Sequence, residues 1–147
     1  MSILDEIYQE VILDHYKNPR CKGCLDNPDG RCTLYNPLCG DQVDVTISIQ
    51  DDTIVDIAFS GHGCSISQAS ASMMSDLCKG RKVKDVLNLC GLFKEMMRGS
   101  KEESEIEGLG DAAALQGVRK FSARVKCAML AWEAVEKCML KPGYETT

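Results

Sequence analysis

The sequence predicts an α+β fold, with a small antiparallel sheet of about three strands and four to five helices packed on one face. Two adjacent segments, 43–50 and 55–60, alternate apolar and polar residues with a period of two, which is typical of half-buried strands. Apolar residues at helical spacing dominate the beginning and the second half of the chain. No internal repeat or linker divides the 147 residues, so we expect a single domain over 1–147.

The N-terminal quarter is predicted as one helix followed by a loop. Apolar residues share one face of a helix over about Leu4–His15, and Asn18-Pro19 ends it. Residues 18–36 contain glycines, prolines and three cysteines and are predicted as a loop. Leu34 and Tyr35 are a candidate third strand.

The two alternating segments predict a hairpin with one buried face. A turn near Asp51-Asp52 separates them. In the second strand, Val55, Ile57 and Phe59 are expected to face the core because they occupy alternate positions.

The remainder of the chain is predicted to be mostly helical. The expected helices run from Ser65 or Ser67 to Gly80, over about Val83–Met97, from Asp111 to Val118 and over about Ala123–Leu140. Residues 99–110 are polar and acidic and are predicted as an exposed insertion, and 141–147 as a flexible tail.

The composition of the chain argues against several classes of function. The net charge is −5 and no basic patch interleaved with aromatic residues is visible, which argues against nucleic-acid binding. No segment is long and apolar enough to span a membrane, and Met1–Tyr16 lacks the basic start of a signal peptide, so we expect a cytosolic protein. Nine cysteines in a reducing compartment favour metal binding or sulfur chemistry over a disulfide framework.

Three cysteines and one aspartate lie near the ends of predicted elements, and Cys39, Asp41 and Cys64 stand beside glycines. Cys39 and Asp41 precede the first strong strand, Cys64 follows the second, and Cys127 lies early in the last helix. Because the entry to one hairpin strand lies beside the exit from the other, Cys39, Asp41 and Cys64 should meet at one end of the sheet. The last helix can reach the same end with Cys127. Three thiolates and a carboxylate suit a tetrahedral zinc ion, whereas the alternative for each cysteine is a small buried hydrophobe.

Four segments, taken in this order, resemble the U-type iron–sulfur cluster assembly proteins: NPLCGD at 36–41, GHGCSIS at 61–67, ASASMM at 69–74 and ARVKCAMLAW at 123–132. The resemblance extends from the first helix to about Leu140. Lys126 stands where the IscU-like scaffold branch of this family carries a histidine, and the stretch 99–110 matches an insertion of the SufU branch. Both features favour the SufU branch.

The resemblance implies that Cys39, Asp41, Cys64 and Cys127 bind zinc. It implies a SufS-type cysteine desulfurase as sulfur donor and a SufBCD-type scaffold complex downstream. Cys39 is then the favoured persulfide acceptor and Cys127 the second candidate. Arg124 either supports a thiolate or is a solvated surface residue. We expect an accessory sulfurtransferase rather than a free-standing enzyme, since the sequence suggests no Ser/His/Asp arrangement, P-loop or dinucleotide fingerprint.

Several alternatives stay open at this point. The same ligands suit a [2Fe–2S] cluster, which would make the protein a scaffold, and a purely structural zinc site is a third reading. Cys21, Cys24 and Cys32 have the spacing C-x2-C-x7-C, one ligand short of a closed zinc site, and are expected to be ordinary thiols with a second metal site as the alternative. His15, at the end of the first helix, and His62 are not expected to be ligands.

Overall fold

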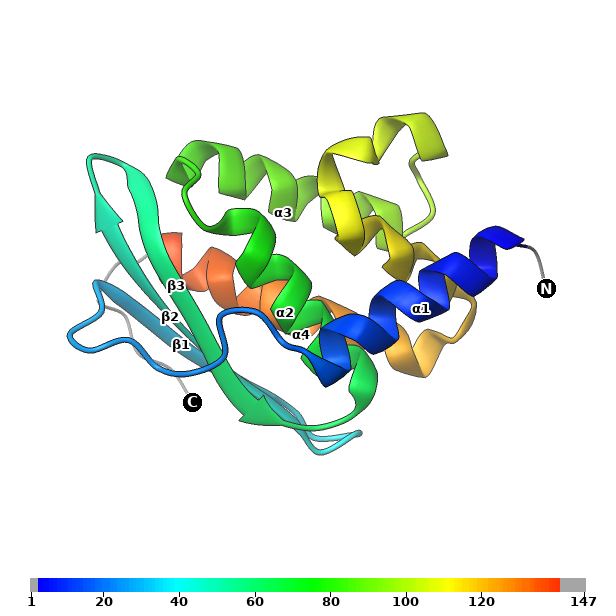
Figure 1. Ribbon diagram of the computed structural model, residues 1–147, viewed down its shortest axis with the longest axis horizontal. Helices are drawn as coiled ribbons and strands as arrows, with labels where there is room; N and C mark the ends of the chain where they lie inside the picture. The colour runs from blue at the N-terminus through cyan, green and yellow to red at the C-terminus, as the bar shows by residue number, and fades with distance from the viewer. Residues whose placement is uncertain (1–2, 141–147) are drawn as a thin grey trace.

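The sheet and the helices form separate layers, with the helices on one side of the sheet (Figure 1). The computed structural model describes residues 3–140, so the tail predicted at 141–147 lies outside the described residues. In chain order the elements are α1 (Ile3–Lys17), β1 (Gly30–Asn36), β2 (Asp41–Gln50), β3 (Thr53–His62), α2 (Ser65–Cys78), α3 (Val83–Met97), the 3₁₀ helices η1 (Glu103–Glu105) and η2 (Glu107–Lys120), and α4 (Ser122–Leu140). The predicted α+β class is confirmed.

The predicted hairpin forms the centre and one edge of the sheet. β2 pairs antiparallel with both neighbours, giving the order β1-β2-β3. Asp51 and Asp52 both have positive φ, 51° and 59°, which is the backbone of a type I′ turn. This two-residue turn brings the start of β2 beside the end of β3.

The predicted inward face of β3 is wrong at Val55. Ser48 pairs with Asp56, whereas Ile49 pairs with Ile54, so Val55 is the extra residue of a β-bulge. Val55 is 43% exposed and Ile54 is fully buried. A one-residue shift exchanges the two faces of a strand, and the alternation within β3 alone does not reveal where the partner strand slips.

The predicted loop at 18–36 ends earlier than expected, because β1 begins at Gly30 and extends the predicted Leu34-Tyr35 strand. β1 passes close to α4: a Cβ at Gly30 would lie 2.9 Å from the carbonyl oxygen of Cys138. The absence of a side chain at Gly30 allows this approach. The strand exists because β2 supplies its hydrogen-bonding partner, which the local sequence does not show.

The segment before β1 crosses the outer face of the sheet (Figure 1). Cys21 pairs with the edge of β3, and the Leu25 amide donates a hydrogen bond to Thr46 Oγ1 on β2. Cys24 is exposed, whereas Cys32 is fully buried between the sheet and the helices. The geometry therefore favours ordinary thiols over a second metal site, because Cys32 lies on the opposite face from the loop that carries Cys24.

The core lies between the sheet and the helices α2 and α4, which pack directly on it. Trp132 of α4 is fully buried and stacks on Phe93 of α3, with ring centroids 4.3 Å apart. Trp132 Nε1–H donates to Ser70 Oγ on α2 at 3.1 Å.

Burial raises the pKa of the Cys78 thiol to about 12, so this thiol stays protonated. The helical cysteines are all buried, as predicted: Cys78, Cys90 and Cys138.

The segment 99–110 is not wholly exposed, which corrects the prediction for this insertion. The side chains of Glu102, Glu105 and Glu107 face solvent, but Ile106 and Leu109 are buried in the core. These two apolar residues hold η1 and the start of η2 against the body of the protein. The predicted helix from Asp111 to Val118 is part of the longer η2, which bends at Gly110, where φ is +55°.

His15, near the end of α1, is fully buried. Its Nδ1 lies 2.7 Å from Ser72 Oγ on α2, and its Nε2 lies 2.9 Å from Asp111 Oδ2 on η2. A Ser/His/Asp chain therefore exists, contrary to the sequence-based expectation. Ser72 is fully buried and accepts a hydrogen bond from the Arg20 amide. Since no substrate can reach it, this chain joins α1, α2 and η2 and has a structural role.

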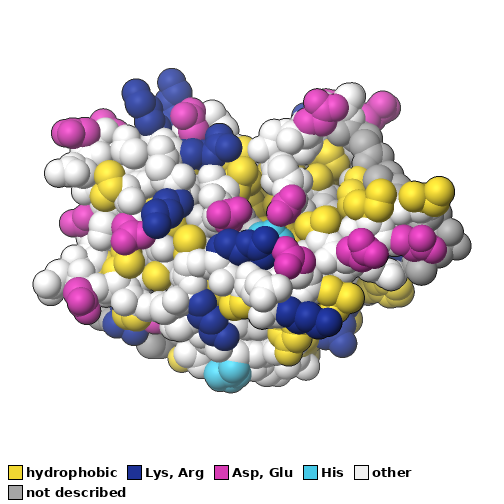
Figure 2. Space-filling view, viewed as in Figure 1, with side chains coloured by type: hydrophobic (Ala, Val, Ile, Leu, Met, Phe, Trp, Pro, Cys, Tyr) yellow, Lys and Arg dark blue, Asp and Glu magenta, His cyan; other side chains and the backbone are white. Residues whose placement is uncertain are grey.

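Charged side chains of both signs are interspersed on the face shown in Figure 2. Among residues 3–140, none of the helices combines the length and the apolar character needed to cross a membrane.

Candidate metal centre

The ends of four elements meet at one end of the sheet, and each contributes one predicted ligand. Cys39 lies in the turn between β1 and β2, and Asp41 is the first residue of β2. Cys64 precedes α2 as its N-cap residue, and Cys127 lies in the second turn of α4. These positions are close because the start of β2 pairs with the end of β3, as Gln42 opposite His62 shows.

The ligand atoms of Cys39, Asp41 and Cys127 all lie within 4.8 Å of one another. The Sγ atoms of Cys127 and Cys39 are 3.2 Å apart. Cys64 borders this group: its amide donates to Asp41 Oδ1 at 2.8 Å, and its Sγ lies 3.7 Å from Asp41 Oδ2. Three of the predicted ligands thus form one close group, and the fourth, Cys64, contacts that group through Asp41.

The donor set suits zinc. A tetrahedral zinc ion binds sulfur at about 2.3 Å and oxygen at about 2.0–2.2 Å, which brings its donors to within about 4 Å of one another. The observed spacings are close to this value. Asp41 and Cys127 are almost fully buried, while Cys39 and Cys64 are half-buried, so an ion here would be enclosed by protein on one side and open to a partner on the other.

Glycine at position 63 is required for this arrangement. Its φ is +148°, a conformation that residues with a side chain rarely adopt. A Cβ there would lie 2.9 Å from Asp41 Cα and Cγ, and it would collide with Asp41 Oδ1. The chain can therefore turn from β3 into α2 next to the Asp41 carboxylate only without a side chain at this point.

Electrostatics in the metal-free chain favour the protonated form of one ligand. Burial, followed by hydrogen bonds with Asp41 and Cys39, raises the pKa of the Cys127 thiol. Arg124, one helical turn before Cys127, faces the same sulfurs. Its neighbours Cys127 and Cys64 raise the pKa of the Arg124 guanidinium, which is fully exposed. Arg124 is thus a cation in a position to stabilise a thiolate here.

The apparent zinc affinity should fall as the pH falls. Because the pKa of Cys127 is raised, the metal-free chain holds this proton at neutral pH, and zinc binding must release it. Lowering the pH from 8 to 7 should weaken the apparent affinity about tenfold through this one proton alone. Competition with a chromophoric chelator across this range measures the effect. A pH-independent affinity would contradict it.

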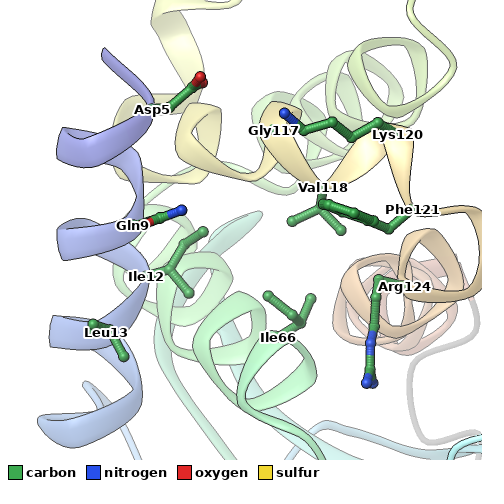
Figure 3. Close-up of a pocket in the computed structure, with 10 residues that line it drawn as sticks. All are labelled: Asp5, Gln9, Ile12, Leu13, Ile66, Gly117, Val118, Lys120, Phe121 and Arg124. Atoms are coloured by element: carbon green, nitrogen blue, oxygen red, sulfur yellow. The ribbon is translucent and has the colours of Figure 1, made fainter. Parts of the chain in front are cut away.

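A groove of about 460 Å³ runs beside the centre, between α1 and the junction of η2 with α4. Ile12, Ile66, Val118 and Phe121 form apolar walls (Figure 3). Arg124 reaches away from Phe121, past Ile66, in this view. Ile66 lies two residues after Cys64, and Arg124 lies three residues before Cys127. The groove therefore adjoins the metal centre.

The chain matches a known family over most of its length. Residues 7–128 match the NifU-like N terminal domain. The chain belongs to this family. This NifU-like chain is 48% identical over 138 residues to the zinc-dependent sulfurtransferase SufU of Bacillus subtilis, a match that covers 94% of the chain and 92% of the relative. It is 42% identical to the iron–sulfur cluster assembly scaffold protein IscU of Streptococcus pyogenes, covering 95% and 86%.

A solved structure supports the same assignment. The crystal structure of a protein from Fervidobacterium islandicum, described as an iron–sulfur cluster assembly scaffold for the SUF system, matches with a TM-score of 0.84 and 32% identity. The match covers 91% of this NifU-like chain and 97% of that one. The resemblance seen in the sequence is therefore confirmed at the level of the family and the fold.

Sequence reasoning missed one residue of the centre. Asn36 ends β1, is 6% exposed, and donates a hydrogen bond from Nδ2 to Cys127 Sγ. Its position, three residues before Cys39, was part of the recognised NPLCGD segment. The contact with Cys127 joins positions 91 residues apart, so no local pattern could reveal it.

Proposed function

We propose that this protein is a zinc-binding sulfur carrier that accepts persulfide sulfur from a cysteine desulfurase and passes it on for iron–sulfur cluster assembly. The observation that carries the proposal is the gathering of three thiols and one buried carboxylate at one end of the sheet. The 48% identity to a zinc-dependent sulfurtransferase supports zinc as the metal. The proposed ligands are Cys39, Asp41, Cys64 and Cys127.

Zinc, when bound, holds its cysteine ligands as thiolates and occupies the lone pairs that would otherwise attack an electrophile. Cys39 is the proposed acceptor because it lies on a turn and is half-buried, whereas Cys127 is fully buried. Once its lone pairs are free of the ion, the Cys39 thiolate attacks the outer sulfur of the donor's persulfide. A new S–S bond forms on Cys39, the S–S bond of the donor breaks, and the donor cysteine leaves as a thiolate. No external oxidant or reductant is needed.

The proposed partners are a SufS-type desulfurase as donor and a SufBCD-type complex as recipient. Arg124 is proposed to support the departing or attacking thiolate from the open side of the centre. The protein acts in this scheme as an accessory sulfurtransferase that turns over only with its donor. We place this exchange in the cytosol, because all nine cysteines are free and thiolate chemistry requires reducing surroundings.

The test combines metal analysis with sulfur transfer. Protein purified without oxygen is expected to contain about one zinc per chain and no visible chromophore. Mixed with a SufS-type desulfurase and ³⁵S-labelled cysteine, the parent should acquire labelled persulfide. Cys39→Ser should lose this label, while Cys24→Ser, an exposed thiol outside the centre, should keep it. Undiminished labelling of Cys39→Ser would reject Cys39 as the acceptor.

The alternative function is a scaffold that assembles a [2Fe–2S] cluster on the same ligands. The 42% identity to an IscU scaffold protein favours this reading, whereas Lys126 in the position of the scaffold histidine favours the sulfur carrier. Iron with labile sulfide in the anaerobic preparation would support the scaffold. Zinc with no transfer of label to any cysteine would support a purely structural site.

A further inference from the structure

One buried amide lies between the two thiols that compete for sulfur. Asn36 is the last residue of β1 and pairs with Asp41 across the turn that carries Cys39. It is 6% exposed. A buried side-chain amide needs hydrogen-bond partners at both its oxygen and its nitrogen, and those of Asn36 point in two directions.

The oxygen end organises the turn. Asn36 Oδ1 accepts a hydrogen bond from the Leu38 amide at 3.3 Å, which is the pattern of an Asx turn. The backbone oxygen of Asn36 also accepts hydrogen bonds from the amides of Cys39 and Gly40, at 3.2 Å and 2.9 Å. Together these contacts fix the loop from which Cys39 projects.

The nitrogen end reaches a different element. Asn36 Nδ2 donates to Cys127 Sγ on α4, at a distance of 3.7 Å. Cys39 Sγ, in contrast, has Cys127 Sγ as its hydrogen-bond partner within residues 3–140. The two sulfurs therefore differ: an amide N–H supports Cys127, and Cys39 lacks that support.

We propose that Asn36 is a positioning residue that keeps Cys127 as a fixed ligand and thereby makes Cys39 the sulfur that is released. This assignment rests on the proposed zinc-dependent function. An N–H donor stabilises charge on a thiolate sulfur and makes that sulfur less nucleophilic. Cys127 is thus held in place, and the less supported Cys39 is the reactive one.

Arg124 does not replace this contact. Its guanidinium also faces Cys127, but it is fully exposed and shares its donors with water. Asn36 is enclosed, so its N–H has little competition from solvent. The difference in burial makes Asn36 the donor that persists when a partner approaches or withdraws.

Two substitutions separate the donor role from the turn. Asn36→Ser keeps a short acceptor for the Leu38 amide but cannot reach Cys127. Asn36→Asp keeps the shape and the acceptor and removes the N–H donor. If Asn36 only shaped the turn, Asn36→Ser would behave like the parent, and Asn36→Asp, which adds a carboxylate near the thiols, would differ only through that charge. Asn88, exposed on α3, supplies matched controls in Asn88→Ser and Asn88→Asp.

Zinc affinity is measured first by competition with a chromophoric chelator, starting from metal-free protein. We expect both Asn36 variants to bind zinc about 10–100-fold more weakly than the parent, as is common when a group that hydrogen-bonds a ligand is removed. Both Asn88 variants should match the parent. Far-UV circular dichroism identifies a variant that has failed to fold, and the other variant then decides.

Alkylation then shows which of the two cysteines is the more reactive. Zinc-loaded proteins are treated with iodoacetamide, and the modified cysteines are mapped by mass spectrometry. In the parent, Cys39 should react before Cys127, and in the Asn36 variants the distribution should shift towards Cys127. Parent-like affinity and distribution in both Asn36 variants would overturn the assignment. A parent that binds no zinc would instead overturn the proposed function itself, and the assignment with it.

Discussion

Replacing Gly63 with alanine should disable the metal centre without changing any ligand. The added Cβ would lie 2.9 Å from Asp41 Cα and Cγ, and the backbone would have to hold a φ of +148°. Asp41 must then move, and the hydrogen bond from the Cys64 amide to its carboxylate must break. Because both ends of this contact belong to predicted ligands, we expect zinc affinity to fall about 10–100-fold and sulfur transfer to fall with it.

Gly91→Ala is the matched control for this substitution. Gly91 lies within α3, and a Cβ there would meet no atom within 4 Å. The same chemical change should therefore leave zinc binding intact and should stabilise the helix by about 1 kcal/mol. Chelator competition and denaturant unfolding of both variants measure the contrast. Parent-like zinc affinity in Gly63→Ala would show that Asp41 does not hold the metal in the arrangement described.

Replacing Trp132 with alanine should give the largest loss of stability. Trp132 is fully buried, stacks on Phe93 at 4.3 Å and donates to Ser70 Oγ. Ser70 in turn donates to the Ala128 carbonyl oxygen at 2.6 Å, so the indole helps to join α2 to α4. We expect the free energy of unfolding to fall by about 3–5 kcal/mol, measured by chemical denaturation of metal-free protein.

Trp132→Phe separates packing from hydrogen bonding. Phenylalanine keeps a ring against Phe93 but removes the N–H donor, so the loss should be smaller than for alanine. Added zinc should recover part of the stability of both variants, because Cys127 lies on the same helix and metal binds only the folded chain. Equal losses for the two variants would show that the hydrogen bond, rather than the stacking, dominates at this position.

The sequence by itself determined the fold class, the hairpin and most of the helices. Period-two alternation places β2, and helical spacing places α1, α2, α3 and α4, since both patterns depend on which face of a single element is buried. The candidate ligands were also predicted from the sequence: Cys39, Asp41 and Cys64 lie next to glycines at the ends of predicted elements, and Cys127 lies in a segment that resembles the family. The family assignment rests on the same local segments.

Tertiary structure decided what depends on two distant segments. The bulge that exposes Val55 arises from slippage against β2. The burial of His15 depends on Ser72 and Asp111, which are 57 and 96 residues away. The role inferred for Asn36 depends on Cys127 on the last helix. Periodicity reports only that a side chain faces inward, whereas the partner it meets there is fixed by how the elements pack, and packing involves residues that no local window contains.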